Sequence, residues 1–295
     1  MNKTEIQTRT GAEPLSPEQR QQQQALRDQK AEQIMAAVRG FFVRVIPPLM
    51  GIGLLLLGWM ILSQYRPQIP NPAVTWQSAL ELFADPFYQN GPNDQGIGWN
   101  ILNSLKRVGL GFGLAALLGI PLGFLIGRFV FIQRMLAPII ALLRPVSPLA
   151  WLPIGLLAFK AAEPASIWVI FISSIWPIIL NTAAGVAQVP QDYLNVARVL
   201  QLSEWKVFTK ILLPSSLPYL LTGIRLSIGV AWLVIVAAEM LTGGVGLGFW
   251  VWDEWNNLNV AHIIIAIFVV GLVGLAIEQL LVLLTRLVSR AETAS

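Results

Sequence analysis

Two arginines lie inside stretches of the chain that are otherwise apolar. Arg144 follows Arg134, at the expected inner boundary of the membrane, by ten residues, which places it about 15 Å deep on a helix. Arg225 follows Pro214 by eleven residues, or about 16 Å by the same rise. A charge at that depth is costly, so each arginine should face the protein interior and have a partner or a task. Two such cations on separate spans predict a path for a small anion.

The alternative is that these arginines are structural. One or both would then pair with Glu278, which lies about 12 Å from the inner end of the last apolar stretch, or with carbonyl groups at helix ends. An oxyanion path also needs uncharged donors that attract the ion without trapping it. The candidates beside the arginines are the hydroxyl and amide side chains of Ser147, Ser173, Ser174 and Asn181.

Composition excludes most catalytic chemistry. The chain has no cysteine and one histidine, His262, so thiol chemistry and histidine metal clusters are excluded. Glycine-rich runs begin at Gly109 and Gly243, but the first lies in an expected span, the second lies on the expected outer side, and neither forms a phosphate loop. We therefore expect a non-catalytic chain that binds no metal or cofactor and does not hydrolyse ATP by itself.

The elements that must position the arginines are membrane-spanning helices. The chain has 295 residues and is 55% hydrophobic and only 12% charged, where a soluble domain averages about 25% charge. We expect an all-α polytopic protein in which prolines around Arg144 break the third span, as membranes tolerate only where the break faces protein or water. The six expected spans are residues 41–65, 108–127, 135–159, 167–184, 219–238 and 261–284.

The sequence also predicts local structure between and within the spans. Residues 66–100 predict a loop with a short helix at 75–83, and residues 241–258 predict a loop with an interfacial belt of tryptophans. In the second span, Gly119, Gly123 and Gly127 repeat every four residues, which bares one helix face for close packing.

The distribution of basic residues sets the orientation. The inner segments, residues 1–45, 128–134, 185–214 and 285–295, hold fourteen Lys or Arg, and the outer segments hold four. The positive-inside rule therefore places both termini in the cytoplasm. Residues 1–40 form a Gln-rich extension with a helix that begins near Ser16, residues 41–290 form the transmembrane domain, and residues 291–295 form a tail.

One polar stretch, Asp192 to Pro218, lies between two apolar spans on the cytoplasmic side. It predicts an amphipathic helix, then a second amphipathic piece from Trp205, and a turn back towards the membrane at Pro214. The residues expected on the apolar face of the first helix are Leu194, Ala197, Val199, Leu200 and Leu202. Such a helix is either a docking element or an interfacial connection between two spans.

The same stretch resembles the cytoplasmic loop of permeases in binding-protein-dependent ABC importers. That loop carries Glu-Ala-Ala, three residues, Gly, nine residues and Ile-x-Leu-Pro. Here the triplet begins at Asn195, the glycine position is Gln201, and the pattern ends at Pro214 with the full spacing. The runs LLGIPLGFLIG, ILNTAAGVAQVP and GLGFWVWDEWNN are similar to the nitrate, bicarbonate and taurine or sulfonate branch, and most similar to cyanobacterial nitrate permeases, with bicarbonate permeases close behind.

That resemblance implies a type I importer permease that forms a homodimer in the cell inner membrane. Two ATP-binding subunits, which hold ATP and Mg, would dock beneath it, an external solute-binding protein would deliver a small inorganic anion, and no nucleic acid would be bound. It also implies that residues 192–214 couple the permease to the ATP-binding subunits. The implied coupling residues are Asn195, Val196, Ala197, Arg198, Leu200, Gln201, Leu202, Ser203 and Trp205.

The favoured mechanism is alternating access driven by the ATP-binding subunits, for nitrate and nitrite, with bicarbonate or a sulfonate as the alternative. A secondary anion transporter that works without ATP is a different class. It would need internal symmetry or a buried ion-coupling site, whereas we find no convincing repeat and one intramembrane acid, Glu278. A membrane enzyme is disfavoured because no catalytic constellation is present.

Overall fold

The computed structural model describes residues 17–293, and within them it contains helices, turns and one isolated bridge between Gln89 and Gln95, with no strand. The all-α prediction is confirmed. The first sixteen and last two residues lie outside the described part, and so do the predicted helix cap at Ser16 and the end of the predicted tail.

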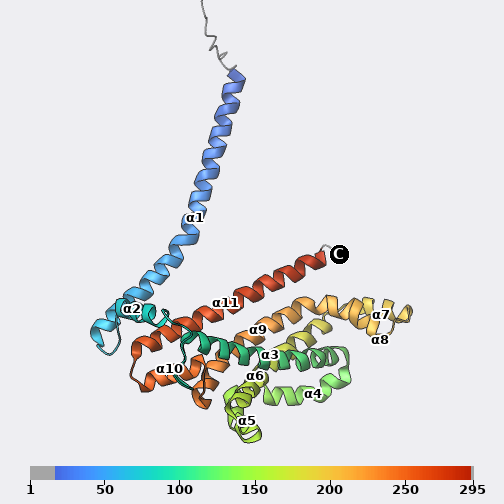
Figure 1. Ribbon diagram of the computed structural model, residues 1–295. Helices are drawn as coiled ribbons and strands as arrows, with labels where there is room; N and C mark the ends of the chain where they lie inside the picture. Colours follow the sequence, from blue (N-terminus) through green and yellow to red (C-terminus); the bar gives the residue numbers. More distant parts are fainter. Residues whose placement is uncertain (1–16, 294–295) are drawn as a thin grey trace, which may run out of the picture. The chain divides into compact units, whose positions relative to one another are not determined.

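The chain divides into two units, residues 1–67 and 68–295. The described part of the first is one helix, α1 (Pro17–Tyr65), in which the predicted N-terminal helix and first span are continuous (Figure 1). Residues 39–65 are apolar enough to cross a membrane, and none of the side chains in that window is buried within the chain. A helix that is apolar on all sides suits a lipid environment.

The second unit contains the remaining helices (Figure 1). In chain order they are α2 (Pro72–Leu82), α3 (Ile97–Arg128), α4 (Val130–Leu143), η1 (Pro148–Trp151), α5 (Leu152–Phe159), α6 (Ala162–Ala187), α7 (Gln191–Val199), α8 (Glu204–Val207), η2 (Phe208–Leu212), α9 (Leu213–Thr242), α10 (Leu247–Asn256) and α11 (Val260–Thr293).

Five helical stretches of the described chain are long and apolar enough to span a membrane, and a bent pair would make a sixth. The pair is α4 with η1 and α5, which meet at an angle of 95° around Arg144 to Ser147. The predicted break in the third span is therefore confirmed. Its cause is local, because Pro145 and Pro148 have no N–H with which to continue the helix.

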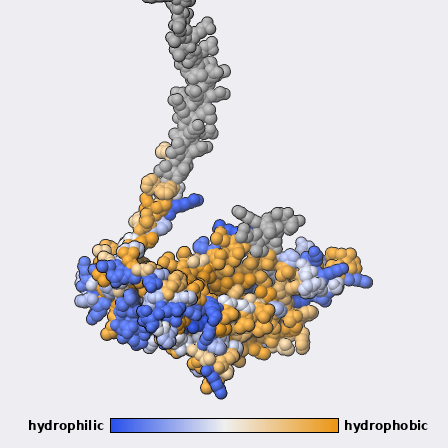
Figure 2. Space-filling model, in the orientation of Figure 1, coloured by the Kyte–Doolittle hydropathy of each residue, from blue (hydrophilic) through white to orange (hydrophobic). Residues whose placement is uncertain are grey.

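The core of the second unit is the packing of α6 against α3 and α9. The glycine repeat of α3 makes the first contact possible, as predicted: a Cβ at Gly123 would lie 2.5 Å from the Cβ of Thr182, and one at Gly127 would lie 2.6 Å from that of Val186. Hydrophobic side chains cover much of the visible surface of this unit. Hydrophilic ones gather around α2 and α10 and, at the opposite end, around α7 and α8 (Figure 2).

Three sequence predictions about these elements are wrong. The second span begins at Ile97 rather than Val108, so Lys106 and Arg107 belong to a helix and not to an outer loop. Most of the predicted loop at 241–258 is helix α10. The chain does not turn at Pro214, because this proline occupies the first turn of α9, where a missing N–H is tolerated, and the helix continues from Glu204 to Thr242.

Candidate functional site

The predicted docking region is a helix, a tight turn and a second helix. On α7, Ala197 is 3% exposed and packs with Val186, Val189 and Leu212 in a small apolar cluster that joins α7 to the ends of α6 and α9. Leu194 and Leu202 pack against the same cluster. Leu194, Ala197 and Leu202 of the predicted apolar face therefore hold this region to the membrane-spanning helices. The prediction is wrong for Val199 and Leu200, which are exposed because the helix ends there and the chain turns at Gln201.

The opposite side of this region is exposed and also apolar. Val196 is 57%, Val199 82% and Leu200 63% exposed. The polar side chains of Asn195 and Arg198 are exposed on the same helix. Exposed apolar patches on a surface that faces water commonly mark sites of protein–protein contact. We call this surface the docking patch, formed by Tyr193, Val196, Val199, Leu200 and Trp205.

The turn after α7 requires a left-handed residue. Gln201, at the glycine position of the importer motif, has φ of +50°. The N–H of Leu202 donates to the carbonyl of Ala197 at 3.0 Å, which closes the helix end. The side chain of Ser203 then caps α8 by accepting from the N–H of Lys206 at 3.4 Å. At Gln201 the motif therefore specifies a left-handed backbone conformation and not a side-chain contact.

Replacing Gln201 with glycine is expected to leave the fold intact and to stabilise it by about 0–1 kcal/mol. Left-handed backbone costs a non-glycine residue about 1–2 kcal/mol, and glycine loses part of this gain through its flexibility in the unfolded chain. Gln201→Val is the matched control and should lower the melting temperature, since a β-branched residue is poorly tolerated at positive φ. Thermal unfolding of the purified protein in detergent measures both. A less stable Gln201→Gly variant would contradict this view of the turn.

Aromatic rings join the docking region to α3. Trp205 stacks on Phe208 with ring centroids 5.5 Å apart, and Phe208 meets Phe124 of α3 edge-on at 4.9 Å. Arg128, at the end of α3, pairs with Glu204 at 3.2 Å. Since α8, η2 and α9 form one helical stretch, a force on Trp205 is applied directly to a membrane-spanning helix.

Arg144 lies at the bend between α4 and η1 and lines a cavity of about 540 Å³. Its side chain is exposed, and no described residue forms an ion pair or side-chain hydrogen bond with it. The cavity is otherwise mainly apolar, with Ser173, Asn181 and Trp176 among its lining residues. A free cation at the edge of an apolar cavity is an attractive site for a small anion.

The uncharged candidates differ in what they can offer. Ser173 lines the cavity but donates its hydroxyl to the carbonyl of Ile170 at 2.8 Å, and Asn181 uses one amide hydrogen on Pro177. Ser147 is exposed just before η1. Ser174 points elsewhere: its hydroxyl is buried without a partner, and its carbonyl accepts from Ser227 of α9.

Arg225 is paired with Glu278. The two side chains, from α9 and α11, lie 2.5 Å apart and are each about half exposed. They line a separate cavity of about 420 Å³, which shares Leu226 and Val230 with the Arg144 cavity. Arg225 therefore has the acidic partner that the structural alternative required, and Arg144 has none among the described residues.

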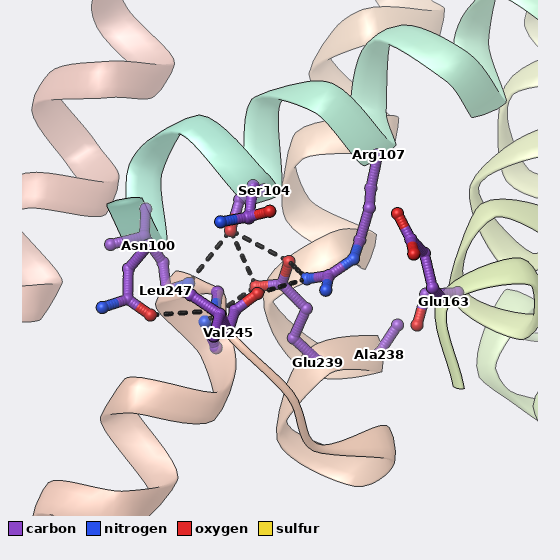
Figure 3. Close-up of polar contacts among 12 residues, drawn as sticks. Asn100, Ser104, Arg107, Glu163, Ala238, Glu239, Val245 and Leu247 are labelled. Atoms are coloured by element: carbon purple, nitrogen blue, oxygen red, sulfur yellow. Dashed lines mark hydrogen bonds and ion pairs between the residues drawn. The ribbon is translucent and has the colours of Figure 1, made fainter. Parts of the chain in front are cut away.

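A buried carboxylate that the sequence analysis missed lies at the other end of α9. Glu239 has no exposed surface, and it accepts hydrogen bonds from Ser104 at 2.8 Å, from Arg107 at 2.6 Å and from the N–H of Gly248 at 3.0 Å (Figure 3). Glu278 is therefore not the only acid within the spans. The signal was present in AEMLTGGVGLG, where an acid precedes a glycine run by a few residues.

Five helical stretches that can cross a membrane, with a further span broken around Arg144, indicate a polytopic membrane protein. The chain matches the family of binding-protein-dependent transport system inner membrane components over residues 119–292, and it belongs to that family. It is therefore assigned to the transport subunits of ABC importers and not to the enzymes.

Two permeases of known importers are similar to this chain over most of its length. The nitrate import permease protein NrtB of Synechocystis sp. is 49% identical over 250 residues, which cover 84% of this chain and 91% of that protein. The bicarbonate transport system permease protein CmpB of the same organism is 46% identical over 249 residues, with coverages of 83% and 89%. A solved inward facing structure of the MetNI methionine ABC transporter has a TM-score of 0.46 and 15% identity, over 62% of this chain and 94% of that chain.

Proposed function

We propose that this chain is the permease subunit of an ATP-driven importer for a small oxyanion, and that the oxyanion is nitrate, with nitrite as its close analogue. The observation that carries the proposal is the 49% identity, over 91% of its length, with a nitrate import permease. Arg144, which has no ion-pair partner in the described part of the chain, lies beside a cavity and supports the proposal, because a monovalent oxyanion needs positive potential and only a few donors along its path.

In this proposal two copies of the chain lie in the cell inner membrane with both termini in the cytoplasm. Each docking patch fits into one of two ATP-binding subunits, which hold ATP and Mg, and an external solute-binding protein delivers the anion. An exposed apolar surface with an aromatic anchor such as Trp205, 71% exposed, is typical of an energetically important contact.

Transport would proceed by alternating access. ATP binding closes the ATP-binding subunits and moves the docking patch, and α8 to α9 carry that movement into the membrane because they are one helical stretch. The Arg144 cavity opens outward to accept the anion and inward after hydrolysis. Arg144 lowers the free energy of the anion inside an otherwise apolar cavity.

Bicarbonate is the second candidate substrate, because a bicarbonate permease is 46% identical over nearly the same length. Both anions are planar, monovalent and of similar size, so Arg144 alone does not separate them. The external solute-binding protein would then provide most of the selection.

Uptake by the complete complex in proteoliposomes tests the substrate. We expect ATP-dependent accumulation of labelled nitrate, competition by nitrite, and little uptake of bicarbonate or taurine. Accumulation of bicarbonate in place of nitrate would overturn the assignment. Nitrate uptake that persists without ATP, or with vanadate present, would instead favour the secondary transporter.

A further inference from the structure

The segment that links α9 to α10 is held by three side chains from one face of α3. Asn100, Ser104 and Arg107 are spaced by four and three residues, so they point to the same side of the helix (Figure 3). Asn100 accepts from the N–H of Gly246 at 2.9 Å, Ser104 accepts from the N–H of Leu247 at 3.0 Å, and Arg107 donates to the carbonyl of Val245 at 2.8 Å.

Glu239 completes this arrangement from α9. It binds Ser104 and Arg107 of α3, and it accepts from the N–H of Gly248 in the first turn of α10. Free N–H groups at a helix start favour a negative charge. We call these four side chains and the backbone of Val245 to Gly248 the Glu239 network.

The glycines of the segment permit this close approach. A Cβ at Gly246 would lie 2.4 Å from the Glu239 carboxyl carbon, and a Cβ at Gly248 would lie 2.0 Å from the carbonyl oxygen of Val236. The glycine run therefore has a packing role, and it fixes the start of α10 against α9 and α3.

The network joins the helices that carry the docking contacts. Glu239 lies near one end of the helical stretch Glu204–Thr242, and Trp205 lies at its other end. α3 is bound to this stretch twice, by Arg128–Glu204 near the docking patch and by Arg107–Glu239 at the far end. α10 follows on the expected outer side, with Trp252 and Trp255 exposed.

Resting on the transport function proposed above, we infer that Glu239 is a positioning residue of the transport cycle: it fixes the outer helix α10 to α3 and α9, so that α10 moves with them when the outer side of the path opens and closes. Without the network, ATP-driven movement reaches α9 but is no longer transmitted to α10.

The natural absence of cysteine makes the inference directly testable. A single Asn256→Cys, at the exposed end of α10, is labelled with a membrane-impermeant maleimide in the complete complex, nucleotide-free and after trapping with ATP and vanadate. We expect the labelling rate to differ between the two states in the native background, and to become equal in Glu239→Gln. Equal responses in the two backgrounds, or no response in the native one, would overturn the inference.

Matched variants separate positioning from general damage. Glu163 of α6 forms an exposed ion pair with Lys106 of α3. Glu163→Gln removes the acid from this pair and should leave the labelling difference unchanged. Asn93→Cys, in the loop before α3, reports a site that the network does not hold, and its labelling should not respond to Glu239→Gln. If Glu239→Gln does not assemble, Asn100→Ala decides, because it removes the acceptor for Gly246 and leaves the buried ion pair in place.

Two further readouts distinguish this inference from the proposed function. In Glu239→Gln we expect basal ATPase activity to persist while uptake falls by about tenfold or more, as for loss of a buried charge partner. Inhibition of ATPase activity by vanadate in the same sample reports that the ATP-binding subunits of the complex hydrolyse ATP, whatever anion it carries. A complex without vanadate-sensitive ATPase activity would refute the proposed function, whereas a sensitive complex with an unchanged α10 response would refute only the role of Glu239.

Discussion

Acidic residues at Val199 and Leu200 are expected to abolish substrate-stimulated ATPase activity and uptake while the permease still inserts and folds. Both side chains are largely exposed, at 82% and 63%, so their replacement leaves no cavity in the core. In the proposed complex they would be buried against an ATP-binding subunit, where an unpaired carboxylate costs several kcal/mol. We expect Val199→Asp with Leu200→Asp to weaken association by about a hundredfold or more. Co-purification and ATPase assays of the reconstituted complex measure the effect.

The control places an acidic residue outside the patch. Gln188 is exposed at the end of α6, and Gln188→Asp should leave both association and stimulation close to native. If the double variant still bound the ATP-binding subunits and responded to substrate, α7 would be an interfacial connection and not a docking element.

The overall architecture was predictable because hydrophobic length is a strong signal in membranes. The first span and the broken third span were read correctly, as was the glycine face at Gly119, Gly123 and Gly127. The helix ends were not. α3 begins eleven residues before the predicted start of its span. The prediction stopped at Lys106 and Arg107, whose acidic partners, Glu163 and Glu239, are 57 and 132 residues away in sequence.

The candidate site was predictable to a similar degree. The position of α7 was predicted correctly from local amphipathic spacing and from the motif, but Val199 and Leu200 are exposed and not on its packed face. The Glu239 network depends on hydrogen bonds from side chains to the backbone of the segment after α9, and such contacts leave almost no pattern in a sequence. At Pro214 the sequence pattern was misleading. The proline predicted a reversal of the chain, but it lies in the first turn of α9 and the helix continues through it.

The structure also separates two arginines that the sequence treated alike. Both lie within apolar stretches, yet Arg225 has an acidic partner on α11 and Arg144 has none among the described residues. A paired cation already interacts with a carboxylate, and an anion would have to compete with that carboxylate. An unpaired cation keeps its full potential for an arriving anion. The two residues should therefore respond differently to neutralisation.

Arg144→Gln is expected to lower nitrate uptake by about tenfold to a hundredfold, because a hydrogen bond to a charged group is worth about 1.5–3 kcal/mol. Basal ATPase activity should change little, since Arg144 lies at the bend between α4 and η1, away from the docking patch. Arg144→Lys should recover part of the uptake, since it keeps the charge but loses the fork-shaped geometry. Initial uptake rates over a range of nitrate concentrations measure these effects.

The matched control is the double variant Arg225→Gln with Glu278→Gln, which removes both charges of the half-exposed pair and leaves neither unpaired. Exposed ion pairs contribute about 0–1 kcal/mol, so we expect uptake within a few-fold of native. Arg225→Gln alone should be more harmful than the double variant, because it leaves the Glu278 carboxylate unpaired and repulsive to an anion. Equal loss of uptake in Arg144→Gln and in the double variant would mean that both arginines line the path, and native uptake in Arg144→Gln would reduce Arg144 to a structural role.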